Sequence, residues 1–211
     1  MDKKLSCIDC HVVACRKGGE GAPQFCVGES VDKELMGEAM AVYDDPFYRR
    51  VMQTAAEVEA EGYLQWPRVT EIVEFAKRMG FKRLGIATCV GLLNESRILA
   101  DVLRSHGFEV FGAACKAGSV PKTDVGICNY GDKVGHMMCN PALQAKVLNR
   151  EKTELNIVVG LCVGHDSVFY KHSDAIVTTL VTKDRVTGHN PVAPLYTANS
   201  YSKSIYGPER K

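Results

Sequence analysis

The second half of the chain alternates short apolar segments with helical ones, and this alternation limits the folds open to it more than any other feature. Four segments from residue 83 onward have the composition of buried strands: 83–88, 108–114, 155–161 and 175–182. Short buried strands separated by helices indicate a parallel sheet covered on both faces. We therefore predict an α/β fold with a three-layer parallel sheet of four or five strands.

Helical signals fill the intervals between these strands. Residues 94–106 form an amphipathic segment that Gly107 ends. Asn140 and Pro141 open a later helix, because Asn is a good cap and Pro is tolerated at the first helical position. A short helix is expected near residues 166–172. The order strand, helix, strand is what a parallel sheet requires.

A helical lead-in and a cysteine-rich start precede the sheet. Residues 68–79 place apolar side chains at helical spacing, and Gly80 ends that helix. Residues 31–63 also look helical, with a helix start at Pro46. Residues 1–30 are rich in Cys and Gly without clear periodicity. We expect two parts: a metal-binding knuckle over 1–30, and a helical lead-in plus α/β domain with a second cysteine site over 31–211.

Composition and charge narrow the class of protein. The 211 residues are 45% hydrophobic and carry a net charge of +1, so the chain can bury a core and shows no basic patch for nucleic acid. No apolar run is long enough for a signal peptide or a membrane span, so a cytoplasmic location is expected. Thiols stay reduced in that compartment. The nine cysteines are therefore expected to bind metal or to act chemically, not to form disulfides.

Four of the cysteines lie close together near the N-terminus. They form the pattern Cys7-x2-Cys10-x4-Cys15-x10-Cys26. Two cysteines two residues apart can grip one metal centre from a tight turn, and four thiolates suit a tetrahedral zinc ion or a cubane iron–sulfur cluster. The remaining spacing matches neither a zinc ribbon nor a compact ferredoxin, and His11 is an alternative zinc ligand. A zinc staple that only folds the first 30 residues is the simpler alternative.

A second set of cysteines marks the ends of the predicted strands. Cys89, Cys115 and Cys162 follow or end three different strands, and Cys139 immediately precedes a helix cap. The carboxyl ends of parallel strands meet at one edge, where such sheets bind ligands. A single cysteine of this kind would be an ordinary core residue. Four together favour a second metal or redox centre, with Cys128 as an alternate ligand.

The string Gly-Leu-Cys-Val-Gly-His-Asp-Ser around Cys162 supplies candidate catalytic residues. His165 could donate a proton beside a metal centre, because its imidazole titrates in the useful range. Asp166 is the second candidate, with capping of the next helix as its structural alternative. A structural role is an equally good interpretation of His165.

The charged turn after the fourth strand carries Lys183, Asp184 and Arg185. One of these side chains could orient an anionic substrate. A solvated charged turn is the simpler interpretation, and we adopt it as the expectation.

Several sequence strings together resemble a known family. They are CxxCHxxxCRKG, ATCVGLLNESRILADVL, MCNPALQAKVLN and the run from NIVVGLCVGHDSVFYKHSDA to VTKDRVTGHNPVAPLY. The chain is similar to a prokaryotic domain-of-unknown-function family of uncharacterized, cysteine-rich, metal-binding proteins, mostly from anaerobes. The resemblance implies metal binding by both cysteine sets, and its anaerobic setting favours iron–sulfur over zinc. Cys128 falls outside the family pattern.

These observations combine into one functional hypothesis. We expect an iron–sulfur redox protein with one or two 4Fe-4S clusters, in which the N-terminal cluster passes electrons to the strand-end centre. A small-molecule substrate and a redox partner protein would follow from that role, and a homo-oligomer is compatible with it. The alternatives are a zinc-binding structural or regulatory module and a metal carrier.

Overall fold

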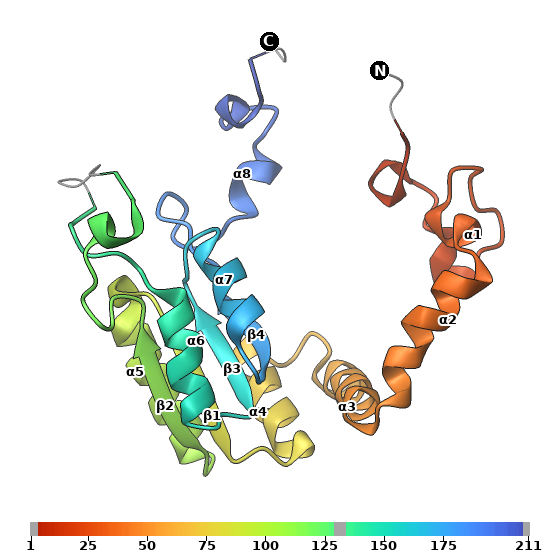
Figure 1. Ribbon diagram of the computed structural model, residues 1–211. Coiled ribbons are helices and arrows are strands. Elements are labelled where there is room, and N and C mark those ends of the chain that lie inside the picture. Colours follow the sequence, from red (N-terminus) through yellow and green to blue (C-terminus); the bar gives the residue numbers. More distant parts are fainter. Residues whose placement is uncertain (1–3, 129–133, 209–211) are drawn as a thin grey trace. The chain divides into compact units, whose positions relative to one another are not determined.

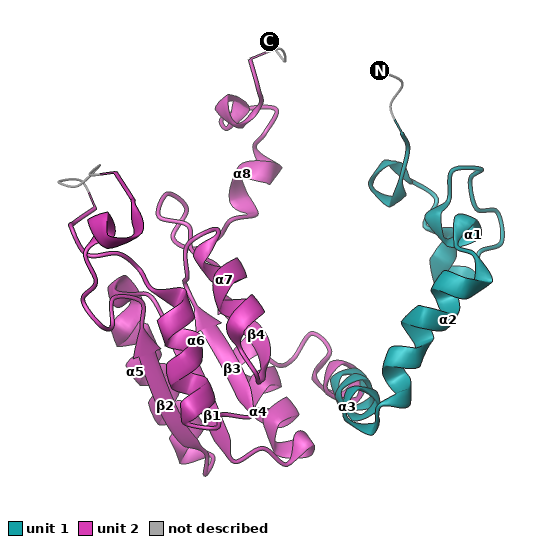
Figure 2. Cartoon of the chain, in the orientation of Figure 1, with its two compact units in different colours: residues 1–56 teal, residues 57–211 magenta. Residues whose placement is uncertain are grey.

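The computed structural model describes residues 4–128 and 134–208, which divide into two compact units. Unit 1 is Met1–Ala56 and unit 2 is Glu57–Lys211 (Figure 2). The boundary falls inside helix α3, Pro46–Gly62. None of the described helices is both long and apolar enough to cross a membrane.

Unit 1 consists of short helices and turns. Three 3₁₀ segments, Cys7–Asp9, Ala14–Lys17 and Val42–Asp44, accompany α1 (Val27–Ser30) and α2 (Lys33–Ala41). Asp32 caps α2 by accepting a hydrogen bond from the Leu35 amide at 2.8 Å. Few apolar side chains of this unit are buried, so its helices carry no extensive core of their own.

Unit 2 confirms the predicted α/β fold. Its four strands are all parallel and lie in the order β2-β1-β3-β4 (Figure 1). The strands are β1 (Arg83–Thr88), β2 (Glu109–Ala114), β3 (Leu155–Val159) and β4 (Ile176–Val181). The helices are α4 (Arg68–Met79), α5 (Leu93–Ser105), α6 (Pro141–Arg150), α7 (His165–His172) and the short α8 (Ala193–Tyr196).

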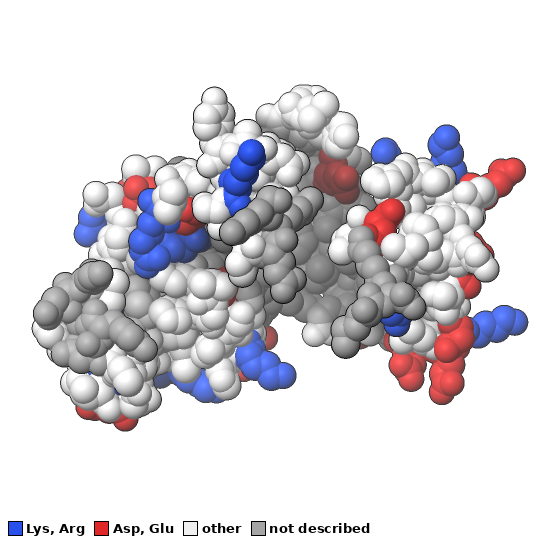
Figure 3. Space-filling model, turned by 90° about the horizontal axis from the view of Figure 1, so that it is seen from above, with Lys and Arg blue, Asp and Glu red and all other residues white. Residues whose placement is uncertain are grey.

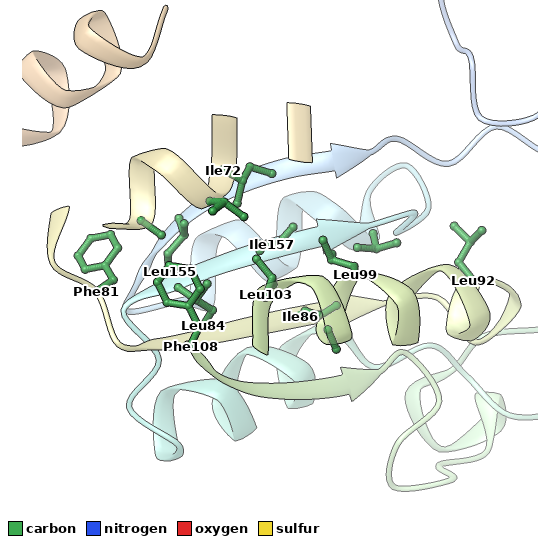
Figure 4. Packing of buried hydrophobic residues seen from close by; sticks show 14 residues of the cluster. Ile72, Phe81, Leu84, Ile86, Leu92, Leu99, Leu103, Phe108, Leu155 and Ile157 are labelled. Carbon is green, nitrogen blue, oxygen red and sulfur yellow. The ribbon is translucent and has the colours of Figure 1, made fainter. Parts of the chain in front are cut away.

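The sheet is the middle of three layers. Helices α4 and α5 cover one face, where Ile72, Leu103 and Ile157 belong to one apolar cluster (Figure 4). Helices α6 and α7 cover the other face, where Leu148 and Phe169 are fully buried with strand residues. Burial on both faces explains why the two central strands read as continuous apolar runs.

The strand order creates a switch point between β1 and β3. The chain leaves β1 through α5 to β2 on one side, and then returns through α6 to β3 on the other side. Open α/β sheets bind ligands beyond the carboxyl ends of the strands at such a point. This edge of the sheet is where the cysteines are found.

Strand β3 ends earlier than the predicted segment 155–161. Gly160 adopts a φ of +70°, a left-handed conformation that stops the extended backbone after Val159. A side chain at this position would be strained by the left-handed φ, and its Cβ would lie 2.1 Å from Leu92 Cδ1 unless the Leu92 side chain moved. The turn at Gly160 brings the following residues back toward the end of β1.

Candidate functional site

The carboxyl edge of the sheet brings four cysteines together, one from each of four separate segments. Backbone hydrogen bonds continue past the strands and hold these segments side by side. The Cys89 amide donates to the Val159 carbonyl at 3.1 Å, and the Cys115 amide donates to the Thr88 carbonyl at 2.8 Å. The Asn140 amide then donates to the Cys115 carbonyl at 2.7 Å, which fixes Cys139 beside Cys115.

Cys115 lies at the centre of this thiol cluster, which we define as Cys89, Cys115, Cys139 and Cys162. Its sulfur is 3.7 Å from the Cys139 sulfur and accepts a hydrogen bond from the Val90 amide at 3.4 Å. The Cys89 and Cys115 thiols also hydrogen-bond to one another. Cys89 and Cys115 are buried, and Cys139 and Cys162 are half-buried. The cluster is therefore reachable from solvent on its Cys139 and Cys162 side.

The thiols of the cluster are electrostatically unequal. The hydrogen bond between Cys139 and the Cys115 thiol lowers the pKa of Cys139 to about 7, and nearby Lys116 acts in the same direction. The hydrogen bond with Cys115, followed by burial, raises the pKa of Cys89 to about 12. The pKa of Cys115 is also raised, first by its bond to Cys139. Among these three thiols, the first thiolate therefore forms at Cys139.

Two cations from the loop after β4 lie against the thiol cluster. Arg185 donates from Nη2 to the Cys162 sulfur at 3.0 Å, and this bond raises the pKa of the guanidinium. Lys183 Nζ and the Cys89 sulfur lie 4.0 and 3.9 Å from the position that a Cβ on Gly91 would take. Lys183 opposes the rise in the pKa of the Cys89 thiol, as the smallest of its causes. Arg185 is exposed and Lys183 is half-buried, so the turn is in contact with solvent as expected. Its proximity to the thiol cluster was not expected, because that depends on where β4 ends.

A buried glutamine on α6 supports the same edge. Gln144 is fully buried, and its side-chain amide donates to the Thr88 carbonyl at 3.1 Å and to the Ala113 carbonyl at 2.7 Å. Thr88 directly precedes Cys89, and Ala113 lies two residues before Cys115. Gln144 thus ties α6 to the two strand ends that present Cys89 and Cys115. No sequence motif marks Gln144, because its partners are backbone carbonyls.

His165 and Asp166 form the first turn of α7. Both backbone amides donate to the Cys162 carbonyl, at 2.9 and 3.1 Å, so the helix start is attached to the cysteine. The helix cap is Gly164, while the Asp166 carboxylate accepts from the Ser167 amide at 2.8 Å. Within the described residues the His165 imidazole makes no hydrogen bond. A catalytic role for either residue stays a prediction.

The N-terminal cysteines are arranged differently. Cys7 and Cys15 are exposed on separate 3₁₀ segments, Cys10 ends the first of these segments and Cys26 precedes α1, both half-exposed. Local hydrogen bonds organise this segment, such as those from the Cys10 amide to the Cys7 carbonyl at 3.2 Å and from the Ser6 amide to the Asp9 carboxylate at 3.0 Å. Across residues 4–128 and 134–208, no three His, Cys, Asp or Glu side chains are already gathered as ligands of one metal ion.

Cys128 stands apart from both sets. It is exposed in the loop that connects β2 to α6, and no hydrogen bond involves its thiol in the part of the chain that the structure describes. It therefore offers an internal control for experiments on the thiol cluster.

Comparison with known proteins places these features in a family. A family model described as "Protein of unknown function (DUF1847)" matches residues 26–180, which include the whole thiol cluster. An uncharacterized protein of Methanocaldococcus jannaschii, MJ0455, is 40% identical over 205 residues, covering 96% of this chain and all of that protein.

Proposed function

We propose, for a chain that belongs to the family described as "Protein of unknown function (DUF1847)", that it is a metal-binding protein with an iron–sulfur redox role. The observation that carries the proposal is the convergence of Cys89, Cys115, Cys139 and Cys162 at the switch point of the sheet. These residues come from four segments of the chain, and two of them, Cys89 and Cys115, also belong to the apolar core on the α6 and α7 side of the sheet.

The chemistry of the donor set supports a soft metal. The thiol cluster offers four sulfurs, and soft thiolate ligands select zinc, copper(I) and iron–sulfur clusters over the hard cations. Its half-buried position limits solvent access, which is one of the factors that set the potential of a cluster. A bound iron–sulfur cluster would supply one-electron transfer.

We assign a role around such a metal centre to three cysteines of the thiol cluster and to two neighbouring residues. Cys139 is the thiol with the lowered pKa, so it is the first ligand ready without proton loss near neutral pH. Cys89 and Cys115 would release their protons on binding, as metal coordination requires. His165, at the start of α7, is the proposed proton donor to a small-molecule substrate, with Asp166 beside it.

The presence of two four-cysteine sets in one chain favours iron–sulfur over zinc in this proposal. Two clusters in one chain would allow electrons to pass from one centre to the other, whereas a single zinc staple would not require both sets. We assign the N-terminal set, Cys7, Cys10, Cys15 and Cys26, to the second centre and to exchange with a redox partner protein.

Zinc is the second candidate, and one distance favours it. A tetrahedral site with metal–sulfur bonds of about 2.3 Å separates its sulfurs by about 3.8 Å. The Cys115 and Cys139 sulfurs are 3.7 Å apart, which suits two ligands of a single ion. In that form the centre would stabilise the sheet edge without exchanging electrons.

Anaerobic reconstitution with iron and sulfide tests the proposal. We expect broad visible absorbance, with iron and acid-labile sulfide in equal amounts, and a marked loss of both in Cys162→Ala. Cys128→Ala is the matched control, because this exposed cysteine lies outside the thiol cluster, and it should retain the wild-type content. A colourless protein that takes up only zinc would contradict the redox role, and equal uptake by Cys162→Ala would contradict the site.

A further inference from the structure

The loop after β4 presents two cations to the thiol cluster, and its own hydrogen bonds hold it in shape. Asp184 accepts from the Val186 amide at 2.8 Å and from the Thr187 amide at 3.0 Å. The Asp184 amide donates to His189 Nδ1 at 3.1 Å, and the His189 amide donates back to the Asp184 carbonyl at 2.8 Å. Arg185 therefore projects from a turn whose backbone is fixed on both sides.

The charge of Asp184 is engaged within this turn. Bonds from the Thr187 and Val186 amides lower the pKa of its carboxyl, with the Thr187 backbone as the largest cause. Within residues 4–128 and 134–208, neither Lys183 nor Arg185 forms an ion pair with a carboxylate. Arg185 Nη2 lies 3.0 Å from the Cys162 sulfur, and Lys183 Nζ lies beside Gly91 together with the Cys89 sulfur.

The net charge of the thiol cluster with a bound metal explains what these two cations could do. Four thiolates around a divalent ion, or around a cluster core of the same charge, leave a net charge of minus two. Holding that charge in a half-buried site is costly unless opposite charges or hydrogen bonds compensate it. Lys183 and Arg185 together supply two positive charges beside these sulfurs.

We propose that Lys183 and Arg185 are the counter-ions of the thiol cluster, and that the Arg185 bond to the Cys162 sulfur helps to retain the metal and raises its reduction potential. This inference rests on the proposed function. Partners in the shell around metal ligands affect affinity by about 10- to 100-fold, and hydrogen bonds to cluster sulfurs are among the factors that set the potential. Both cations are positioning residues, because they act through the ligands. Figure 3 looks down on the molecule from above the view of Figure 1 and shows Lys and Arg side chains on this face of unit 2.

Cobalt(II) titration of the full chain measures the effect directly. The assay uses a Cys10→Ser/Cys15→Ser background, so that only the sheet-edge thiols give thiolate-to-cobalt absorbance, and Cys162→Ala in that background defines the site. We expect Arg185→Gln to weaken the cobalt Kd by about 10- to 100-fold. Arg185→Lys keeps the charge but loses the forked donor, so its loss should be smaller. Arg150→Gln, at the exposed end of α6, should match the background protein.

Further measurements distinguish a failure of the counter-ion inference from a failure of the proposed function. Iron-loaded Arg185→Gln should show a more negative midpoint potential than the background protein. Unchanged Kd and potential in Arg185→Gln overturn this inference and leave the proposed function intact. If Arg185→Gln fails to fold, Arg185→Lys and Lys183→Gln are measured in its place. A cobalt Kd and a midpoint potential equal to those of the background protein in both variants overturn the inference. A background protein that binds neither cobalt nor iron overturns the proposed function and this inference together.

Discussion

Two regions of the molecule hold four cysteines each, and in both the spacing along the sequence is a poor guide to how the thiols are arranged in the structure. The N-terminal set is compact in sequence, yet its thiols lie on separate exposed turns. The thiol cluster is spread from Cys89 to Cys162, yet Cys115 contacts its neighbours and all four thiols lie at one edge. A parallel sheet can therefore bring cysteines that are distant in sequence to one edge. Among the described residues, however, neither set already gathers three side chains as ligands of one metal ion, so both would have to close around a metal.

Single cysteine substitutions should distinguish the two cysteine sets with the largest effect. Cys115→Ser removes the sulfur that joins Cys89 to Cys139, so we expect the sheet-edge centre to be lost and the iron content after reconstitution to fall by about half. Cys15→Ser should leave the sheet-edge centre intact. Loss of that centre in Cys15→Ser but not in Cys115→Ser would reverse the assignment.

The thiols of the cluster should react with alkylating agents at very different pH. The thiolate is the nucleophile, so Cys139, with a pKa of about 7, should react half-maximally near that pH and slow as the pH falls below it. Cys89, with a pKa of about 12, should stay unreactive across the neutral range. Residue-resolved mass spectrometry of the metal-free protein measures both rates, and Cys115→Ala should move the Cys139 midpoint to higher pH. Equal rates at Cys89 and Cys139 would contradict the coupling between the thiols.

Gly160 tests the backbone that returns the chain to the sheet edge. An alanine there meets Leu92 and must adopt a left-handed φ, so Gly160→Ala should lower the free energy of unfolding by about 2–4 kcal/mol. Gly112→Ala is the control, since its added Cβ would have an ordinary contact of 3.8 Å with the Ile86 carbonyl oxygen. Urea unfolding gives both values. A neutral Gly160→Ala would mean that the turn is not fixed as described.

Substitution of Gln144 tests whether its hydrogen bonds stabilise the strand ends that carry the cysteines. It has the smallest expected effect on the free energy of unfolding. Gln144→Leu removes two hydrogen bonds to buried carbonyls, which should cost about 1–3 kcal/mol. The substitution also removes the buried Gln144 Oε1, which has no hydrogen bond among the described residues, so the loss should fall at the lower end. Lys146→Leu on the exposed side of α6 is the control for the same measurement, and a cost in Lys146→Leu equal to that in Gln144→Leu would remove the support role.

Much of the fold could be predicted from local pattern. The helix over 68–79 and the strand over 83–88 match α4 and β1, because helical spacing and apolar runs are strong signals for buried elements. The end of β3 was placed two residues late, because Gly160 and Leu161 continue the apolar run while the turn depends on a contact with Leu92.

The site was less accessible to prediction from sequence. The strand ends placed the four cysteines at one edge, but their roles as ligands stay predictions. Arg185 was named only as a possible contact for an anionic substrate, and its bond to Cys162 was not predicted because that bond depends on the position of β4 beside β3. Gln144 was missed because its partners are backbone carbonyls, which no side-chain motif reveals.

The most direct test is a crystal structure of the anaerobically reconstituted protein with anomalous data at the iron edge. The account predicts an iron peak bound by Cys89, Cys115, Cys139 and Cys162, with the Arg185 guanidinium on the Cys162 sulfur. Iron at the N-terminal cysteines alone, with the four sheet-edge sulfurs unligated, would contradict it.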